Sequence, residues 1–137
     1  TPDALDNVLS TLQKVTKGRV VIVFGATGDR DKAKRPIMGE LVAKNADYIY
    51  LTDDETYTED PASIRAAVME GITKGRGAAK TTEIADRRKA IAVAFKQAQK
   101  GDVILLAGIG HQDYRAMGGK NIPWDERVVA REELAKI

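Results

Sequence analysis

The sequence GRVVIVFGATGDRDKAKRPIM, residues 18–38, decides the fold of this chain. Val20–Phe24 is an unbroken apolar run of β-branched and aromatic residues, which predicts a strand buried on both faces, as in a parallel sheet. Gly25–Gly28 predicts a tight turn, where glycine permits positive φ and the close approach of a ligand. Lys34–Lys44 predicts a helix with Pro36 in its first turn.

Outward from this stretch, helical and strand patterns alternate along the chain. Helices are predicted from Pro2 to about Lys17, from Pro61 to about Thr73, from Asp86, and from Trp124 to Ile137; strands are predicted at 46–51, 80–84 and 103–107, and a hairpin at 117–122. This order predicts a single α/β domain, a doubly wound, Rossmann-like fold with a mostly parallel sheet and helices on both faces.

Composition limits the classes of function. The 137 residues are 43% apolar and 31% charged, as in a globular protein. The formal net charge of +2 gives no reason to expect a nucleic-acid or membrane partner. With no cysteine and a single histidine, a metal site held by the protein is not expected. No stretch reads as a membrane span or a signal peptide, so we expect a cytoplasmic protein.

Three loops are predicted to meet at one edge of the sheet, because the carboxyl ends of parallel strands lie on the same side. They follow Phe24, Leu51 and Ala107. They carry Asp29, Arg30 and Asp31, then Asp53, Asp54, Glu55 and Tyr57, then Gly108, Gly110, His111 and Gln112. Both charge signs suit a zwitterion, with an arginine for its carboxylate and acids for its ammonium group. The alternative for the charged run 29–35 is a solvated loop rim.

Two single residues have a structural and a functional interpretation. His111 is a candidate general acid or base, but the sequence favours a role in ordering its Gly-rich loop. Trp124 is expected to pack rather than to stack on a ligand. The chain has no Gly-Lys-Ser/Thr phosphate loop, so a triphosphate cradle, if one is used, lies outside it.

At residues 28–38 the sequence resembles the Mur ligases, in particular the UDP-N-acetylmuramoyl-tripeptide synthetases. Gly28-Asp29-Arg30-Asp31-Lys32, followed by Lys34-Arg35-Pro36 and Met38, is similar to a signature of that family. Four further segments resemble its other motifs in the same order along the chain: 1–5, 58–61, 107–114 and 125–127.

The resemblance implies that residues 1–137 are the C-terminal domain of an ATP-dependent amide ligase of peptidoglycan synthesis, acting as a monomer. Residues 1–17 would be the linker helix from an absent central domain. That domain would hold most of the ATP and Mg²⁺. The present domain would hold the incoming amino acid that is joined to UDP-N-acetylmuramoyl-L-alanyl-D-glutamate, and would close over the ATP site. Alone, it is expected to be inactive.

The resemblance also implies roles for single residues. Arg30 would bind the carboxylate of the incoming amino acid. Asp54 falls on the aspartate of the family's Asp-Asn-Pro-Arg motif, and Gly108 and Gln112 fall on the loop that meets the distal end of the amino acid. The residues that would face ATP or order the loops are Asp29, Asp31 and His111.

Departures from the family pattern bear on the amino acid. Tyr57 stands where the motif has the arginine that clamps the distal carboxylate of diaminopimelate, and Asp53 and Glu55 are extra acids nearby that would favour a side-chain ammonium group. L-lysine or L-ornithine is therefore expected in place of meso-diaminopimelate. Gln112 replaces a glutamate of the family and Ile109 a lysine.

Two other functions remain open from the sequence. Residues 24–29 also resemble the turn of nicotinamide-dependent oxidoreductases, although the third glycine of that fingerprint is missing. A non-catalytic amino-acid-binding module with the same fold is the second alternative.

Overall fold

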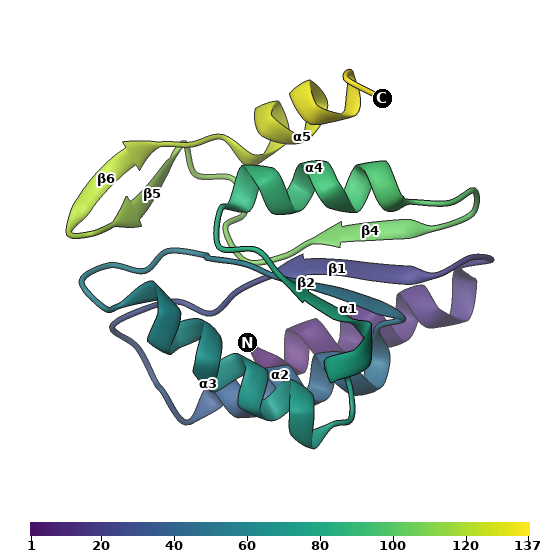
Figure 1. The fold of residues 1–137 in the computed structure, drawn as a ribbon, viewed down its shortest axis with the longest axis horizontal. Coiled ribbons are helices and arrows are strands. Elements are labelled where there is room, and N and C mark those ends of the chain that lie inside the picture. The colour runs from purple at the N-terminus through teal and green to yellow at the C-terminus, as the bar shows by residue number, and fades with distance from the viewer.

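The computed structural model describes all residues, 1–137, and contains five α-helices, a 3₁₀ turn and six strands (Figure 1). The elements in chain order are α1 (Pro2–Val15), β1 (Val20–Phe24), α2 (Lys34–Asn45), β2 (Tyr48–Leu51), α3 (Pro61–Lys74), η1 (Ala78–Lys80), β3 (Thr81–Glu83), α4 (Arg87–Gln97), β4 (Val103–Leu106), β5 (Tyr114–Met117), β6 (Lys120–Pro123) and α5 (Glu126–Leu134).

The main sheet has the strand order β3-β2-β1-β4, and all of its neighbours are parallel. Val23 of β1 lies opposite Tyr50 of β2 and Leu106 of β4. The chain moves from β1 outward to β3 and then crosses back to add β4 on the other side of β1. The order therefore reverses between β1 and β4, and such a switch point opens a crevice at the carboxyl ends of the strands.

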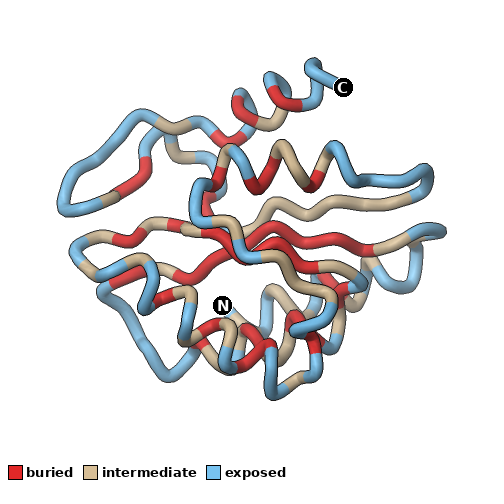
Figure 2. The backbone as a smooth tube through the Cα atoms, in the orientation of Figure 1, coloured by how far each residue is buried: buried red, intermediate tan, exposed pale blue.

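Helices cover both faces of this sheet, as predicted. α1, α2 and α3 lie on one face, with a core that contains Leu9, Ile22, Val42 and Val68. α4 and α5 lie on the other face, around Ile91 and further residues of a second core. Figure 2 shows the buried residues concentrated in the central strands between these two layers.

The hydrophobic pattern predicted the first strand at its observed bounds, and all five of its residues are buried. The apolar run at 103–107 also predicted a strand, which the structure confirms at Val103–Leu106. β4 is one of the two edge strands of the sheet, and all four of its residues are only partly buried. An apolar run cannot indicate how many neighbours its strand has, so a half-covered edge strand reads like a central one.

Side-chain caps lie at the start of four helices, of which α5 begins at Glu126, two residues after the predicted Trp124. Thr1, Asp60, Asp86 and Asp125 each accept a hydrogen bond from a backbone N–H in the first turn of α1, α3, α4 and α5. The last helix ends at Leu134, short of the predicted Ile137. None of the helices is long and apolar enough to cross a membrane.

The hairpin of β5 and β6 turns at Gly118 and Gly119, whose φ angles are 60° and 78°. Two successive positive φ angles are what a two-residue hairpin turn of the right twist requires. Figure 1 shows the hairpin beyond the carboxyl ends of β1 and β4, apart from the main sheet. The hairpin thereby joins the three loops at the edge where the sequence predicted a site.

Candidate functional site

The first loop, residues 25–32, packs directly on the second loop, residues 52–59. Gly28 N donates to the carbonyl of Glu55 at 2.8 Å. A Cβ on Gly25 would overlap the carbonyl of Thr52, and one on Gly28 would overlap that of Thr56. These glycines were predicted to allow positive φ and a ligand's approach, but neither has positive φ. It is the backbone of the second loop that needs the space.

An ion pair between Arg35 of α2 and Glu59 joins the two loops. Arg35 is 3% exposed, and its guanidinium contacts both carboxylate oxygens of Glu59, at 2.5 and 2.8 Å. Arg35 also donates to the carbonyl of Thr27, and Glu59 accepts from Asp29 N at 3.0 Å. Through the guanidinium of Arg35 and the Asp29 N–H, the pKa of Glu59 is lowered to about 2.

The tip of the first loop has three successive charged residues, Asp29, Arg30 and Asp31, and only the side chain of Arg30 lacks a partner. Asp29, at φ 56°, accepts hydrogen bonds from the backbone and hydroxyl of Thr58, and Asp31 accepts from Ala33 N at 3.0 Å. Arg30 is exposed, and no hydrogen bond or ion pair of its side chain is formed. Asp29 and Asp31 order the loop, and Arg30 remains available to an anion.

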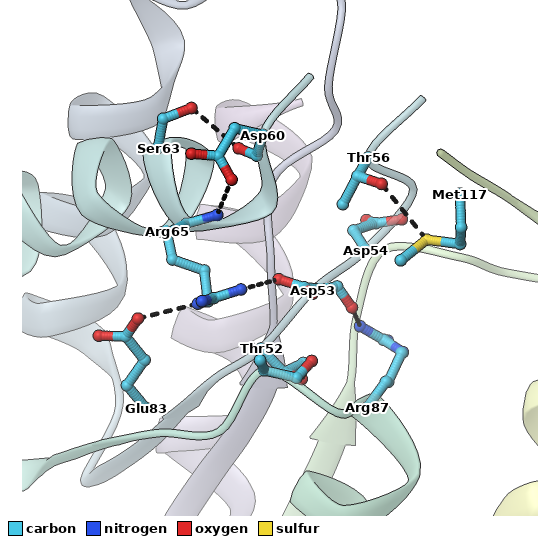
Figure 3. A network of polar contacts seen from close by, with 12 residues as sticks. Thr52, Asp53, Asp54, Thr56, Asp60, Ser63, Arg65, Glu83, Arg87 and Met117 are labelled. Atoms are coloured by element: carbon cyan, nitrogen blue, oxygen red, sulfur yellow. Dashed lines mark hydrogen bonds and ion pairs between the residues drawn. The ribbon is translucent and has the colours of Figure 1, made fainter. Parts of the chain in front are cut away.

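The acids of the second loop are engaged one after another. The carboxylate of Asp53 pairs with Arg65 of α3 at 2.5 Å, and Arg65 also contacts Glu83 at 2.8 Å (Figure 3). Arg87 reaches the carbonyl of Asp53 from the opposite side, at 3.3 Å. Asp53, which the sequence offered for an ammonium group, is therefore held between two arginines.

Asp54 is the buried carboxylate of the site, with 4% of its surface exposed. One oxygen accepts from Glu55 N at 2.6 Å, and the other lies against Gly108 of the third loop, where a Cβ would overlap it. Burial raises the pKa of Asp54, and the nearby Arg87 opposes that shift. Asp54 and Gly108 are thus brought together, as the predicted convergence of the loops required.

Glu55 and Tyr57 bind the hairpin. The carboxylate of Glu55 accepts from Ala116 N at 2.9 Å. Tyr57 has φ 50°, its N–H donates to the carbonyl of Ala116, and its carbonyl accepts from Gly119 N. The second loop therefore has the hairpin as a neighbour on one side and the first loop on the other.

A second buried ion pair ties this region to α5. Arg87 is 1% exposed, and its guanidinium meets both oxygens of Glu126, at 3.0 and 2.6 Å. It also donates to the carbonyl of Ala107, at the start of the third loop, at 3.0 Å. One arginine thus contacts the second loop, the third loop and α5.

Two side chains of the third loop, residues 107–113, contact the elements that follow it in the chain. Nδ1 of His111 lies 2.9 Å from a guanidinium nitrogen of Arg127. Because arginine only donates, Nδ1 accepts, and the proton of a neutral ring is on Nε2. The side-chain amide of Gln112 donates to the carbonyl of Tyr114, two residues on. These contacts join the third loop to α5 through His111 and to the start of β5 through Gln112.

Trp124 packs as expected, although it has polar partners too. Its Nε1 donates to Glu126 at 3.1 Å, and the guanidinium carbon of Arg115 lies 4.6 Å from its ring centroid. Arg115 itself donates to the carbonyls of Asp53 and Asp54, at 3.2 and 2.9 Å.

A mainly apolar pocket of about 290 Å³ opens at the switch point between the ends of β1 and β4. It is lined by the capping residue Thr1, by Leu5 of α1, and by Phe24, Gly25 and Leu105, together with further residues. Its lining contains no lysine or arginine side chain. No group of three or more metal-binding side chains occurs in the structure either.

Four buried charged residues of the site were not singled out by the residue patterns: Arg35, Arg87, Arg115 and Glu126. A charged residue beside a helix start reads as solvated, and nothing in the sequence marks it as buried. Arg35 and Glu126 do fall in the quoted motifs, which was the one available signal.

Comparisons with known proteins agree with the resemblance. Residues 1–110 match the family model described as Mur ligase, glutamate ligase domain. The chain is 48% identical over 136 residues to the UDP-N-acetylmuramoyl-L-alanyl-D-glutamate--2,6-diaminopimelate ligase of Caldanaerobacter subterraneus subsp. tengcongensis, covering 99% of this chain and 28% of that protein. It is 46% identical over 134 residues to the UDP-N-acetylmuramyl-tripeptide synthetase of Leifsonia xyli subsp. xyli, covering 98% and 26%.

A solved structure of a UDP-N-acetylmuramoyl-L-alanyl-D-glutamate--2,6-diaminopimelate ligase superimposes with a TM-score of 0.91 at 39% identity. The superposition covers 99% of this chain and 28% of that chain. The present chain thus spans about a quarter of the length of the proteins that it matches.

Proposed function

Because this chain belongs to the Mur ligase family, as its glutamate ligase domain, we propose that it holds the incoming amino acid of a peptidoglycan ligase. The observation that carries the proposal is the free Arg30 between two engaged acids, at an edge where three loops meet. An exposed guanidinium on a loop that other contacts hold is suited to bind an α-carboxylate in a bidentate manner.

The acceptor of that amino acid is UDP-N-acetylmuramoyl-L-alanyl-D-glutamate in this proposal, as the names of the relatives indicate for those proteins. Activation of its carboxylate by ATP and Mg²⁺ belongs to an upstream domain. The chain has neither a phosphate-loop sequence nor a group of metal-binding side chains that fits these cofactors. Residues 1–137 alone are therefore expected to give no ligation.

For the amino acid itself, we keep L-lysine or L-ornithine ahead of meso-diaminopimelate, although diaminopimelate stands in the names of most of the relatives compared. The argument rests on Tyr57, which offers no charge to a distal carboxylate. The acids contribute less than the sequence suggested, because Asp53 is paired with Arg65 and Glu55 binds Ala116 N.

The test is a ligation assay with the full-length protein, ATP, Mg²⁺ and the UDP-muramoyl-dipeptide. L-lysine, L-ornithine and meso-diaminopimelate are supplied separately, and the products are identified and quantified by mass spectrometry. We expect product with a diamino acid, with lysine or ornithine preferred. Absence of product with every amino acid would overturn the ligase proposal, whereas a preference for diaminopimelate would overturn only the choice of substrate.

The Tyr57→Arg variant sharpens this test. A guanidinium at this position would pair with a distal carboxylate, so we expect the preference to move toward diaminopimelate by about tenfold or more. Tyr57→Phe is the matched control, because it keeps the ring and adds no charge. An unchanged preference in Tyr57→Arg would show that residue 57 does not meet the distal end.

A further inference from the structure

Arg115 is a buried arginine that forms no ion pair. It is 6% exposed, one of its nitrogens donates to the carbonyls of Asp53 and Asp54, and its Nε has no hydrogen-bond partner. A guanidinium that is buried against neutral acceptors loses its hydration and gains no ion pair in return, so its burial has a desolvation cost. Burial and the neighbouring Arg87 accordingly lower the pKa of Arg115. The contacts that offset this cost are its hydrogen bonds to two backbone carbonyls and its position over the ring of Trp124.

What Arg115 does provide is a fixed position for the backbone of the second loop. A single nitrogen bridges two successive carbonyls, and the face of Trp124 supports the guanidinium from below. Trp124 is in turn bonded to Glu126, which Arg87 holds. The bridge therefore rests on a buried network, not on a mobile surface side chain.

The rest of the hairpin continues the same contact along the loop. Ala116 N binds the carboxylate of Glu55, the carbonyl of Ala116 accepts from Tyr57 N, and Gly119 N binds the carbonyl of Tyr57. Tyr57 also forms a parallel β-bridge with Met117. The hairpin thus acts as a strand partner for residues 53–57 and holds Tyr57 at its φ of 50°, which a tyrosine seldom adopts.

We propose that Arg115 is a positioning residue for amino-acid selection, which fixes residues 53–57 so that the loop accepts one distal group and rejects others. This inference rests on the proposed function and deepens it. A displacement of about 1 Å in a binding loop is enough to cost up to about a hundredfold in activity. Arg115 acts through the carbonyls that it holds, without touching the amino acid.

The experiment measures KM and kcat of the full-length protein for its preferred amino acid, and the ratio of kcat/KM between lysine and diaminopimelate. In Arg115→Met we expect KM for the amino acid to rise about tenfold or more, while KM for the UDP-muramoyl-dipeptide stays within about twofold. The lysine-to-diaminopimelate ratio should fall toward one. Arg115→Lys, which keeps a charged donor, should recover part of both losses.

Arg19→Met is the control for a purely structural effect. Arg19 pairs with Asp102 at 2.8 Å, at the opposite, amino-terminal ends of β1 and β4. It should change thermal stability without changing the KM for the amino acid or the ratio. If KM and the ratio are the same in Arg115→Met and the wild type, the inference is wrong. If the wild type ligates no amino acid at all, the proposed function has failed instead.

Discussion

The first and second loops carry similar numbers of charged residues at the same edge of the sheet, but they use them differently. In residues 25–32 the two acids bind backbone or hydroxyl groups and leave Arg30 free. In residues 52–59 Asp53, Asp54 and Glu55 are each bound to another group of the protein. In the proposed function the first loop therefore offers a charge to the amino acid, whereas the second offers a fixed shape.

The comparison shows that a charged residue in a sequence does not by itself indicate whether its side chain is free to bind a ligand or holds a loop in place. Selectivity on this account comes from the shape of the second loop, which Arg87 and the hairpin hold. Binding of the α-carboxylate comes, on the same account, from the first loop, which the Arg35–Glu59 pair holds at Thr27 and Asp29 and joins to the end of the second loop at Glu59. Changing the supports of each loop separately tests the division.

The largest effect is expected at Arg87. Arg87→Met leaves the carboxylate of Glu126 buried without its partner and removes the donor to the carbonyls of Asp53 and Ala107. We expect a loss of about 3–5 kcal/mol in the free energy of unfolding, measured by urea denaturation. The double variant Arg87→Met/Glu126→Leu removes the stranded charge and should recover much of that loss. Equal stability of the single and double variants would contradict this account.

A smaller loss is expected at Arg35. Arg35→Met deprives Glu59 and the carbonyl of Thr27 of their donor, but the side chain of Glu59 is 15% exposed and can turn to water. We expect a loss of about 2–3 kcal/mol by the same denaturation experiment. In the full-length protein, KM for the amino acid should rise without a change in its lysine-to-diaminopimelate ratio. A changed ratio would mean that the loss of Arg35 reaches Tyr57 through Glu59, and that the two loops do not divide the task.

Gly108 and Gly110 offer a matched pair in the third loop. Gly108 has φ 123° and a Cβ there would overlap the carboxylate of Asp54, whereas Gly110 has φ 74° with no atom within 4 Å of such a Cβ. Gly108→Ala should cost about 2–3 kcal/mol and Gly110→Ala about 1 kcal/mol. Thermal unfolding of the two variants is a sufficient measurement. Equal costs would argue that Gly108 does not pack on Asp54.

The smallest effect concerns acid stability. The pKa of Glu59 is lowered from 4.5 to about 2 by Arg35, so its contribution to stability is complete above the unfolded value. That contribution is lost as pH falls from about 4.5 to about 2. In Glu59→Gln the free energy of unfolding should therefore depend less on pH in this window. Asp54 has the opposite effect on stability, because its pKa is raised in the folded state and its protonation removes the cost of burying a charge. A pH profile that is unchanged by Glu59→Gln would contradict the assignment.

Much of the fold followed from the sequence, because its signals are local. The run at Val20–Phe24 and the capping residues at Asp60 and Asp86 gave the strand and two helix starts. The convergence of the three loops followed from parallel topology alone, and the contact of Gly108 with Asp54 bears it out.

The supports of the site could not be predicted in the same way. Arg87 and Arg115 are separated from their partners by 20–62 residues, and no local pattern indicates that an arginine is buried. The position of β4 at an edge of the sheet could not be predicted for the same reason, since the number of neighbours of a strand is a property of the sheet. The role of Gly25 was misjudged because the group that approaches it comes from another loop.

The most direct test of the central claim is the KM of the full-length protein for its amino acid in Arg30→Ala, beside Lys32→Ala as an exposed control on the same loop. The account predicts a rise of about a hundredfold or more in Arg30→Ala, with KM for the UDP-muramoyl-dipeptide unchanged and Lys32→Ala close to the wild type. If Arg30→Ala keeps the wild-type KM for the amino acid, the first loop does not bind the α-carboxylate and the division between the two loops is wrong.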